Sequence, residues 1–167
     1  SLMFLMTAAE PVRTNIHEAF INKFSEYGLI PKSIFSAFGL AEYTLAVSNY
    51  GRTVSSFDKE SLKSKKAVIS INTDEDQVTN LLSCGNALGD TQIAIVDSDS
   101  YQKLQDGRVG EIWLDGTSKC TGYWNKPEMS KEIFEAEIVG QPEKKWLRTG
   151  DLGFLKNDEL FVCGRVK

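Results

Sequence analysis

Histidine and cysteine are scarce in this chain of 167 residues, which has one histidine and three cysteines. Cys84, Cys120 and Cys163 form no Cys-x-x-Cys pair, and an odd number of cysteines fits neither a disulfide scaffold nor a zinc cage. The chain also lacks the run of about eighteen apolar residues that a membrane span needs. These absences argue against a disulfide-rich secreted domain, a zinc enzyme and a membrane-spanning protein, and they favour a cytoplasmic location.

The charge balance gives no support for nucleic-acid binding. The 19 Lys and Arg residues are scattered and outnumbered by 23 Asp and Glu residues, so the net charge is −4. A nucleic-acid partner requires a basic surface, which this composition does not supply. The chain also contains no GxGxxG, GxxxxGK[ST], GxSxG or HExxH sequence, so dinucleotide-binding, P-loop, hydrolase and zincin functions lack their minimum parts.

Patterns of apolar residues predict a mixed α/β fold that begins as the end of an α/β subdomain. Residues 2–9 are predicted to form a buried strand, and apolar residues at steps of three and four then predict a helix from Pro11 that ends at Gly28. Short strands are predicted near residues 33–37 and 44–47. A chain that begins inside a buried strand is expected to be a piece of a larger protein.

Beyond this point the pattern changes. Residues 49–66 are polar and weakly periodic, which predicts an insertion or long loop. Short β-type runs separated by Gly, Asp and Asn turns follow, with one helix predicted over 127–137. We therefore expect a small antiparallel β-barrel subdomain. The expected parts are the α/β subdomain over 1–48, a polar insertion with a connecting strand over 49–80, and the barrel-like subdomain over 81–167.

Three segments carry groups suited to chemistry. They are residues 8–12 (Ala-Ala-Glu-Pro-Val), 38–42 (Phe-Gly-Leu-Ala-Glu) and 147–153 (Leu-Arg-Thr-Gly-Asp-Leu-Gly), with Gly-Arg-Val-Lys at 164–167 after them. Their order and spacing resemble the adenylate-forming superfamily, which includes acyl-CoA synthetases, amino-acid adenylation domains and luciferases. The resemblance extends over nearly the whole chain.

Within that superfamily the chain is most similar to the fatty acyl-AMP ligase branch. The similarity includes Ala9 to Arg13, Gly39 to Leu45, Ser83-Cys84-Gly85 and Val109 to Trp113. The polar stretch around residues 49–80 lies where this branch has an extra insertion. The resemblance therefore implies a fragment that reaches from the large N-terminal domain of such a ligase to its interdomain hinge.

Several residues would form the adenine side of a nucleotide site if the resemblance holds. Backbone groups of Ala8, Ala9 and Glu10 would meet the adenine edge, and Phe38 would stack on the ring. The residues that follow Phe38 belong to the same nucleotide-binding segment, and they are Gly39, Leu40 and Ala41. The chain departs from the family at two of these positions, because the family has Gly where Ala8 stands and more often Tyr where Phe38 stands.

The remaining implied roles concern phosphate, ribose and domain movement. Glu42 would hold Mg²⁺ against the phosphates of ATP, since Mg²⁺ prefers hard oxygen ligands. Asp151 would accept hydrogen bonds from both ribose hydroxyls, and Arg165 would reach the ribose or phosphate side. Lys167 occupies the hinge position. Activating a carboxylate with ATP depends mostly on positioning and electrostatics, which are tasks that these residue types can perform.

The implied reaction joins a fatty acid to AMP, releases pyrophosphate, and passes the acyl group to the pantetheine thiol of an acyl carrier protein. The family's phosphate loop is expected before residue 1 and its catalytic lysine after Lys167, so the fragment alone is predicted to be inactive. Three alternatives remain open. They are an acyl-CoA synthetase, an amino-acid adenylation domain, which normally has Thr at the position of Ala41, and a non-catalytic adenylate-binding or interaction module.

Other conspicuous residues are interpreted as structural. Phe20, Phe24 and Phe35 are predicted to lie in the core. The aromatic residues near the expected barrel turn are also assigned to core and turn positions, and these are Trp113, Tyr123 and Trp124. None of them is assigned to the site.

Overall fold

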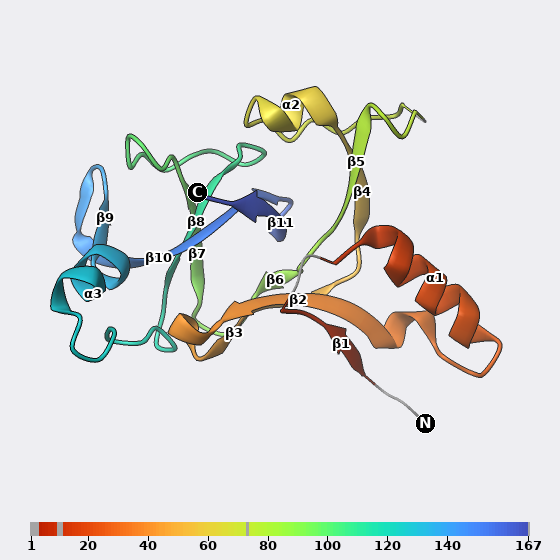
Figure 1. Cartoon of the computed structure of the whole chain (residues 1–167), viewed down its shortest axis with the longest axis horizontal. Coiled ribbons are helices and arrows are strands. Elements are labelled where there is room, and N and C mark those ends of the chain that lie inside the picture. Colours follow the sequence, from red (N-terminus) through yellow and green to blue (C-terminus); the bar gives the residue numbers. More distant parts are fainter. Residues whose placement is uncertain (1–3, 10–11, 73, 167) are drawn as a thin grey trace.

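The computed structural model describes residues 4–9, 12–72 and 74–166, and it contains three β-sheets and three α-helices in this part of the chain (Figure 1). The mixed α/β class predicted from the sequence is confirmed. Within the described ranges, no helix has the length and apolar character needed to cross a membrane.

The first sheet has four strands in the order β1-β2-β3-β6. Strands β1 and β2 are parallel, whereas the other neighbours are antiparallel. The strands are β1 (Leu5–Thr7), β2 (Ile34–Leu40), β3 (Leu45–Gly51) and β6 (Asn86–Ala87). The short turns η1 (Pro31–Ser33) and η2 (Ala41–Tyr43) precede and follow β2. The segment from β1 to β2 is thus the strand–helix–strand unit that the sequence predicts.

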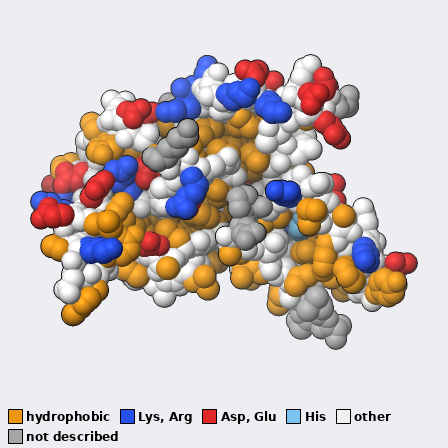
Figure 2. All heavy atoms as spheres, viewed as in Figure 1, with side chains coloured by type: hydrophobic (Ala, Val, Ile, Leu, Met, Phe, Trp, Pro, Cys, Tyr) orange, Lys and Arg blue, Asp and Glu red, His pale blue; other side chains and the backbone are white. Residues whose placement is uncertain are grey.

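Helix α1 (Thr14–Ser25) connects β1 to β2, and its apolar face is exposed. Phe20 and Phe24 remain 38% and 37% exposed, so their assignment to the core is wrong, whereas Phe35 of β2 is buried as predicted. The helix packs on the chain through the side that carries His17, and the two phenylalanine rings contact each other at 4.5 Å between centroids. Figure 2 shows hydrophobic side chains gathered over this helix.

The polar region predicted as an insertion or long loop contains regular structure. Strand β4 (Val54–Asp58) pairs with β5 (Val78–Leu82), and helix α2 (Lys59–Lys63) lies between them in sequence. Asp58 caps α2 by accepting the Ser61 N–H at 2.7 Å. Phe57 is fully buried against Phe154 and Phe161 of the next sheet, with ring centroids 5.1 and 5.5 Å apart. Phe57 is the aromatic anchor of this hairpin, and backbone hydrogen bonds from the Ala67 N–H to the Gly107 carbonyl and from the Val109 N–H to the Lys65 carbonyl add to it.

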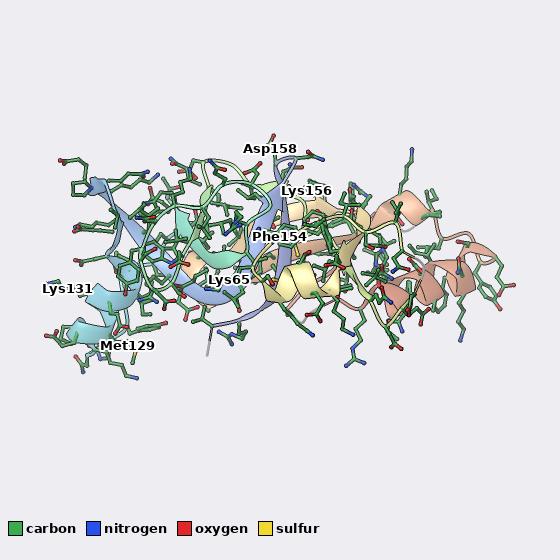
Figure 3. All side chains as sticks on the ribbon, turned by 90° about the horizontal axis from the view of Figure 1, so that it is seen from above. Lys65, Met129, Lys131, Phe154, Lys156 and Asp158 are labelled. Carbon is green, nitrogen blue, oxygen red and sulfur yellow. The ribbon has the colours of Figure 1, made fainter. Side chains whose placement is uncertain are left out.

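The third sheet is antiparallel and has the order β11-β10-β8-β7, with β9 on another part of β10. Its strands are β7 (Gln92–Val96), β8 (Gly110–Asp115), β9 (Ala136–Ile138), β10 (Gln141–Lys156) and β11 (Glu159–Arg165). Helix α3 (Pro127–Phe134) begins at a proline, as predicted. Figure 3 shows Met129 and Lys131 on α3 at one end of the molecule, away from Lys156 and Asp158 at the β10–β11 hairpin.

This third sheet is open, so the expected closed barrel is wrong within the mixed α/β fold. Strand β11 does not pair with β7 to close the sheet. Instead, the Cys84 N–H donates to the Leu160 carbonyl at 2.7 Å, and the Leu160 N–H donates to the Gly85 carbonyl at 2.9 Å. Because the segment before β6 occupies the edge of β11 in this way, the two edges of the sheet do not meet.

One apolar cluster joins the first and third sheets. Tyr43 and Val47 come from the β2–β3 region, whereas Ile112, Leu147 and Leu160 come from β8, β10 and β11, and all five are fully buried. Burying an aliphatic side chain of this size contributes about 1.5–3 kcal/mol relative to leaving it exposed. This cluster therefore fixes the turn between β2 and β3 against the third sheet.

Candidate functional site

Glu42 lies in the η2 turn between β2 and β3, and the third sheet holds this turn in place. The Cys120 N–H donates to the Glu42 carbonyl at 2.9 Å. The buried Tyr43 hydroxyl donates to the Asp115 carbonyl at 2.9 Å, and a Cβ at Gly116 would lie only 2.2 Å from that hydroxyl. Glu42 therefore projects from a backbone that is fixed to both sheets.

Asp151 lies in a bulge of β10. Arg148 pairs with Trp113 and Leu152 pairs with Glu111, so four steps along β10 face only two steps along β8. Gly150 adopts φ +72° inside the bulge, a conformation that suits glycine. Bulges are frequent beside active sites because they redirect a side chain away from the regular pleat. The Thr-Gly-Asp segment thus directs Asp151 by interrupting the strand.

Three hydrogen bonds hold this bulge. The Thr149 hydroxyl donates to the Ile112 carbonyl at 2.8 Å and accepts the Asp151 N–H at 3.0 Å. The Gly150 N–H donates to Glu111 Oε1 at 3.1 Å. The backbone around Asp151 is therefore defined by side chains as well as by strand pairing.

A cleft of about 310 Å³ lies between the η2 turn and this bulge. Glu42, Gly150 and Arg165 line it, together with Glu111, Tyr123, Glu132, Ile133, Arg148, Thr149 and Val166. Arg165 Nε lies 3.1 Å from Asp151 Oδ1, and these two residues are also paired across β10 and β11. The cleft therefore brings Glu42 and Arg165 together from segments far apart in sequence, and Asp151 adjoins it through its contact with Arg165.

The environment of Asp151 raises the pKa of its carboxyl. Burial is the largest cause; the positive charge of Arg165 opposes it, and the negative charges of Glu42 and Glu111 add to it. Four acids and two arginines lie in or beside the cleft, so negative charge is in local excess, which a cation or a hydrogen-bond donor would relieve. The site is thus suited to a ligand that brings hydroxyl donors and a metal ion.

Tyr123 is a site residue that the sequence interpretation missed. Its hydroxyl donates to Glu42 Oε1 at 2.6 Å, and this bond raises the pKa of Tyr123 to about 12. The ring packs edge-on against Phe134 of α3 at 5.1 Å between centroids. No signal in the sequence identifies this role, because both the partial burial of Tyr123 and its polar partner are set by the fold. Of the other two aromatic residues assigned to core and turn positions, Trp113 is fully buried and Trp124 lies in an exposed turn.

The residues predicted to meet adenine lie outside the lining of this cleft. Thr7 pairs with Ser36, so Ala8 and Ala9 follow the carboxyl end of β1 beside β2, and Ala9 adopts φ +74°. Phe38 is half-buried against the core cluster that joins the sheets. Ligands of open α/β sheets bind beyond the carboxyl ends of parallel strands, which is where these residues lie.

The intervening residues shape the start of the turn. A Cβ at Gly39 would lie 1.7 Å from the Leu45 carbonyl oxygen, so no larger residue fits there. Leu40 packs on the core cluster, and the Ala41 carbonyl accepts from the Cys120 thiol at 3.6 Å. Glu10 and Lys167 lie outside the described residues, so their expected roles stay predictions.

The donor set fits a magnesium ion shared with a phosphate ligand. Over the described ranges no group of three or more His, Cys, Asp or Glu side chains is arranged to hold a metal by itself. Glu42 Oε2 has no hydrogen-bond partner among the described residues, because Tyr123 bonds to Oε1. Mg²⁺ is usually held by one or two carboxylates, water and substrate phosphates. Glu42 can therefore supply the single protein ligand that such a site requires.

Comparison with known proteins supports the same kind of site. The profile of the AMP-binding enzyme family matches residues 1–124. The chain belongs to this AMP-binding enzyme family. It is 40% identical over 164 residues to the medium-chain-fatty-acid acyl-carrier-protein ligase JamA of Moorena producens, a match that covers 95% of this chain and 28% of JamA.

Solved structures of AMP-binding enzymes share the fold. A fatty acyl-adenylate ligase from L. pneumophila, determined with acyl adenylate and pyrophosphate, matches with a TM-score of 0.90 and 32% identity over 99% of this chain and 29% of that chain. A fatty acid AMP ligase from Legionella pneumophila matches with a TM-score of 0.89. The resemblance to adenylate-forming enzymes is thus confirmed, and the chain spans less than a third of the length of these relatives.

Proposed function

We propose that the intact enzyme containing this chain activates fatty acids as acyl adenylates and then transfers the acyl group to the pantetheine thiol of an acyl carrier protein. The observation that carries this proposal is the cleft in which Glu42 of the first sheet meets the Asp151–Arg165 pair of the third sheet. The names of the similar ligases support the substrate class and the carrier protein.

The geometry supports the following division of work among the residues. Asp151, directed by its bulge, accepts hydrogen bonds from both ribose hydroxyls of ATP, and Arg165 steadies that carboxylate from the ribose or phosphate side. Glu42 holds Mg²⁺, which neutralises phosphate charge when it is bound. Phe38 and the segment after β1 contact adenine. The chain's contribution is therefore to fix the nucleotide, which is the largest requirement of the reaction.

The acceptor of the acyl group distinguishes two candidate functions. An acyl-CoA synthetase is the competing function, because it would share the adenylation half of the reaction. The anchored β4–α2–β5 hairpin favours the carrier protein, since it occupies the region where the fatty acyl-AMP ligase branch has its insertion. The described cysteines are all free thiols, which fits the proposed cytoplasmic location.

The test uses the intact enzyme with ATP, Mg²⁺ and fatty acids of several chain lengths. We expect pyrophosphate release and acyl-AMP detectable by mass spectrometry. Acyl transfer is then measured with holo acyl carrier protein and with CoA in parallel reactions. Transfer to CoA alone would replace the proposed function by the competing one, and the absence of acyl-AMP with every fatty acid would refute both.

A further inference from the structure

We propose that Glu111 and Arg148 form a buried positioning pair that sets the direction of the Asp151 carboxylate. This inference rests on the proposed function, because it assigns a task to groups behind the residues that would contact ATP. Neither residue carries a role in the sequence interpretation, although both line the cleft.

Glu111 is a buried carboxylate whose bonds all lead to the bulge. Its side chain is 2% exposed. Oε2 accepts from Arg148 Nε at 3.1 Å and lies 3.1 Å from Nη2, while Oε1 accepts from the Gly150 N–H at 3.1 Å. A buried carboxylate is tolerated only with such partners. One side chain of β8 is therefore bonded to β10 directly before Asp151.

Arg148 also has partners other than Glu111, and they restrain the position of its guanidinium group. Its Nη1 donates to the Tyr101 hydroxyl at 3.2 Å. The guanidinium carbon also lies 5.3 Å from the Tyr101 ring centroid and 5.7 Å from that of Trp113. These contacts restrain a flat group with a fixed array of donors. Glu111 is thus held in place, and the Gly150 amide is held by Glu111.

The bulge explains why such a restraint is needed. Two extra residues in β10 leave the Gly150 N–H without a strand partner, and a regular pleat would point Asp151 elsewhere. Glu111 supplies the missing acceptor. Burial is the largest cause of the raised pKa of Asp151; Arg165 opposes it, and the negative charges of Glu42 and then Glu111 add to it. Glu111 therefore acts on the position of Asp151 through the Gly150 amide and adds a smaller influence on its ionisation.

The test compares two Glu111 variants in the intact enzyme. Glu111→Ala removes the acceptor of the Gly150 N–H, so we expect the KM for ATP to rise about tenfold with kcat nearly unchanged. Glu111→Gln keeps an acceptor oxygen but loses the charge, so we expect less than a threefold change in KM. Because the pKa of Asp151 then falls, the acid limb of kcat/KM for ATP should move to lower pH. Glu137→Ala, at an exposed position of β9, is the matched control.

Hydrogen exchange provides a readout that does not depend on adenylation. The amide of Gly150 should exchange at least tenfold faster in Glu111→Ala than in the wild type or in Glu137→Ala. An unchanged exchange rate at Gly150, an unchanged acid limb in Glu111→Gln, or a fall in kcat at constant KM would overturn the inference. If the wild-type enzyme forms no acyl adenylate, the proposed function fails, and the exchange rates alone decide whether Glu111 positions the bulge.

Discussion

Replacing Asp151 by Asn should separate nucleotide binding from stability. The amide loses the negative charge and one acceptor, and a hydrogen bond to a charged group contributes about 1.5–3 kcal/mol. At about 1.4 kcal/mol per tenfold, the KM for ATP in the intact enzyme should rise about 10- to 150-fold. We expect no loss of stability, because Arg165 is 76% exposed and an exposed ion pair contributes at most about 1 kcal/mol.

The ionisation of Asp151 should make both folding stability and ATP binding depend on pH, in opposite directions. Burial raises the pKa of Asp151 in the folded protein, so the folded state holds the proton more tightly than the unfolded chain does. Ionised Asp151 therefore lowers the free energy of unfolding at neutral pH. The free energy of unfolding rises again as the pH falls through the raised pKa and Asp151 takes up its proton. ATP binding follows the opposite course and weakens over the same pH interval.

These expectations can be checked by pyrophosphate-release kinetics and thermal unfolding of wild type and Asp151→Asn from pH 4 to pH 8. At pH 7 the unfolding temperature of the variant should equal or exceed that of the wild type. ATP binding to the variant should no longer weaken as the pH falls. An unchanged KM, or a midpoint several degrees lower at pH 7, would show that Asp151 is a structural residue.

Four further outcomes are expected. Phe57→Ala should lower the free energy of unfolding by about 3–5 kcal/mol in denaturant titration, because a fully buried ring is removed; a loss below 1 kcal/mol would contradict the anchoring role. Gly116→Ala should lower the melting temperature, since the new Cβ would lie 2.2 Å from the Tyr43 hydroxyl. Cys84 is buried and burial raises the pKa of its thiol to about 11, so thiol labelling at pH 8 should reach it only after unfolding; labelling in the folded protein at the rate seen after unfolding would refute this. The isolated chain should form no acyl-AMP above background with ATP, Mg²⁺ and a fatty acid.

The sequence was sufficient where local pattern decides the structure. Periodic apolar residues located α1, and Pro127 marked the start of α3. It was insufficient where distant partners decide. Thr-Gly-Asp has the composition of a turn, and it lies inside a 16-residue strand only because Glu111 and Ile112 supply bonds to the bulge.

The candidate site shows the same division. Glu42, Asp151 and Arg165 could be selected from their segments; Glu42 and Arg165 line one cleft, and Asp151 contacts Arg165 beside it. Tyr123 could not be selected, because its partner Glu42 is 81 positions away in sequence. The β4–α2–β5 hairpin was missed for a related reason, since Phe57 packs on Phe154 and Phe161, which lie far along the chain.

Because Glu42 lies in the turn between two strands of the first sheet and Asp151 lies in the third sheet, a nucleotide that contacts both would link the two sheets at their junction. Nucleotide binding would then raise the free energy needed to separate the two sheets. This increase would grow with the logarithm of the ratio of the nucleotide concentration to its dissociation constant. The two sheets would therefore separate most easily in the empty enzyme and least easily when the adenylate is bound.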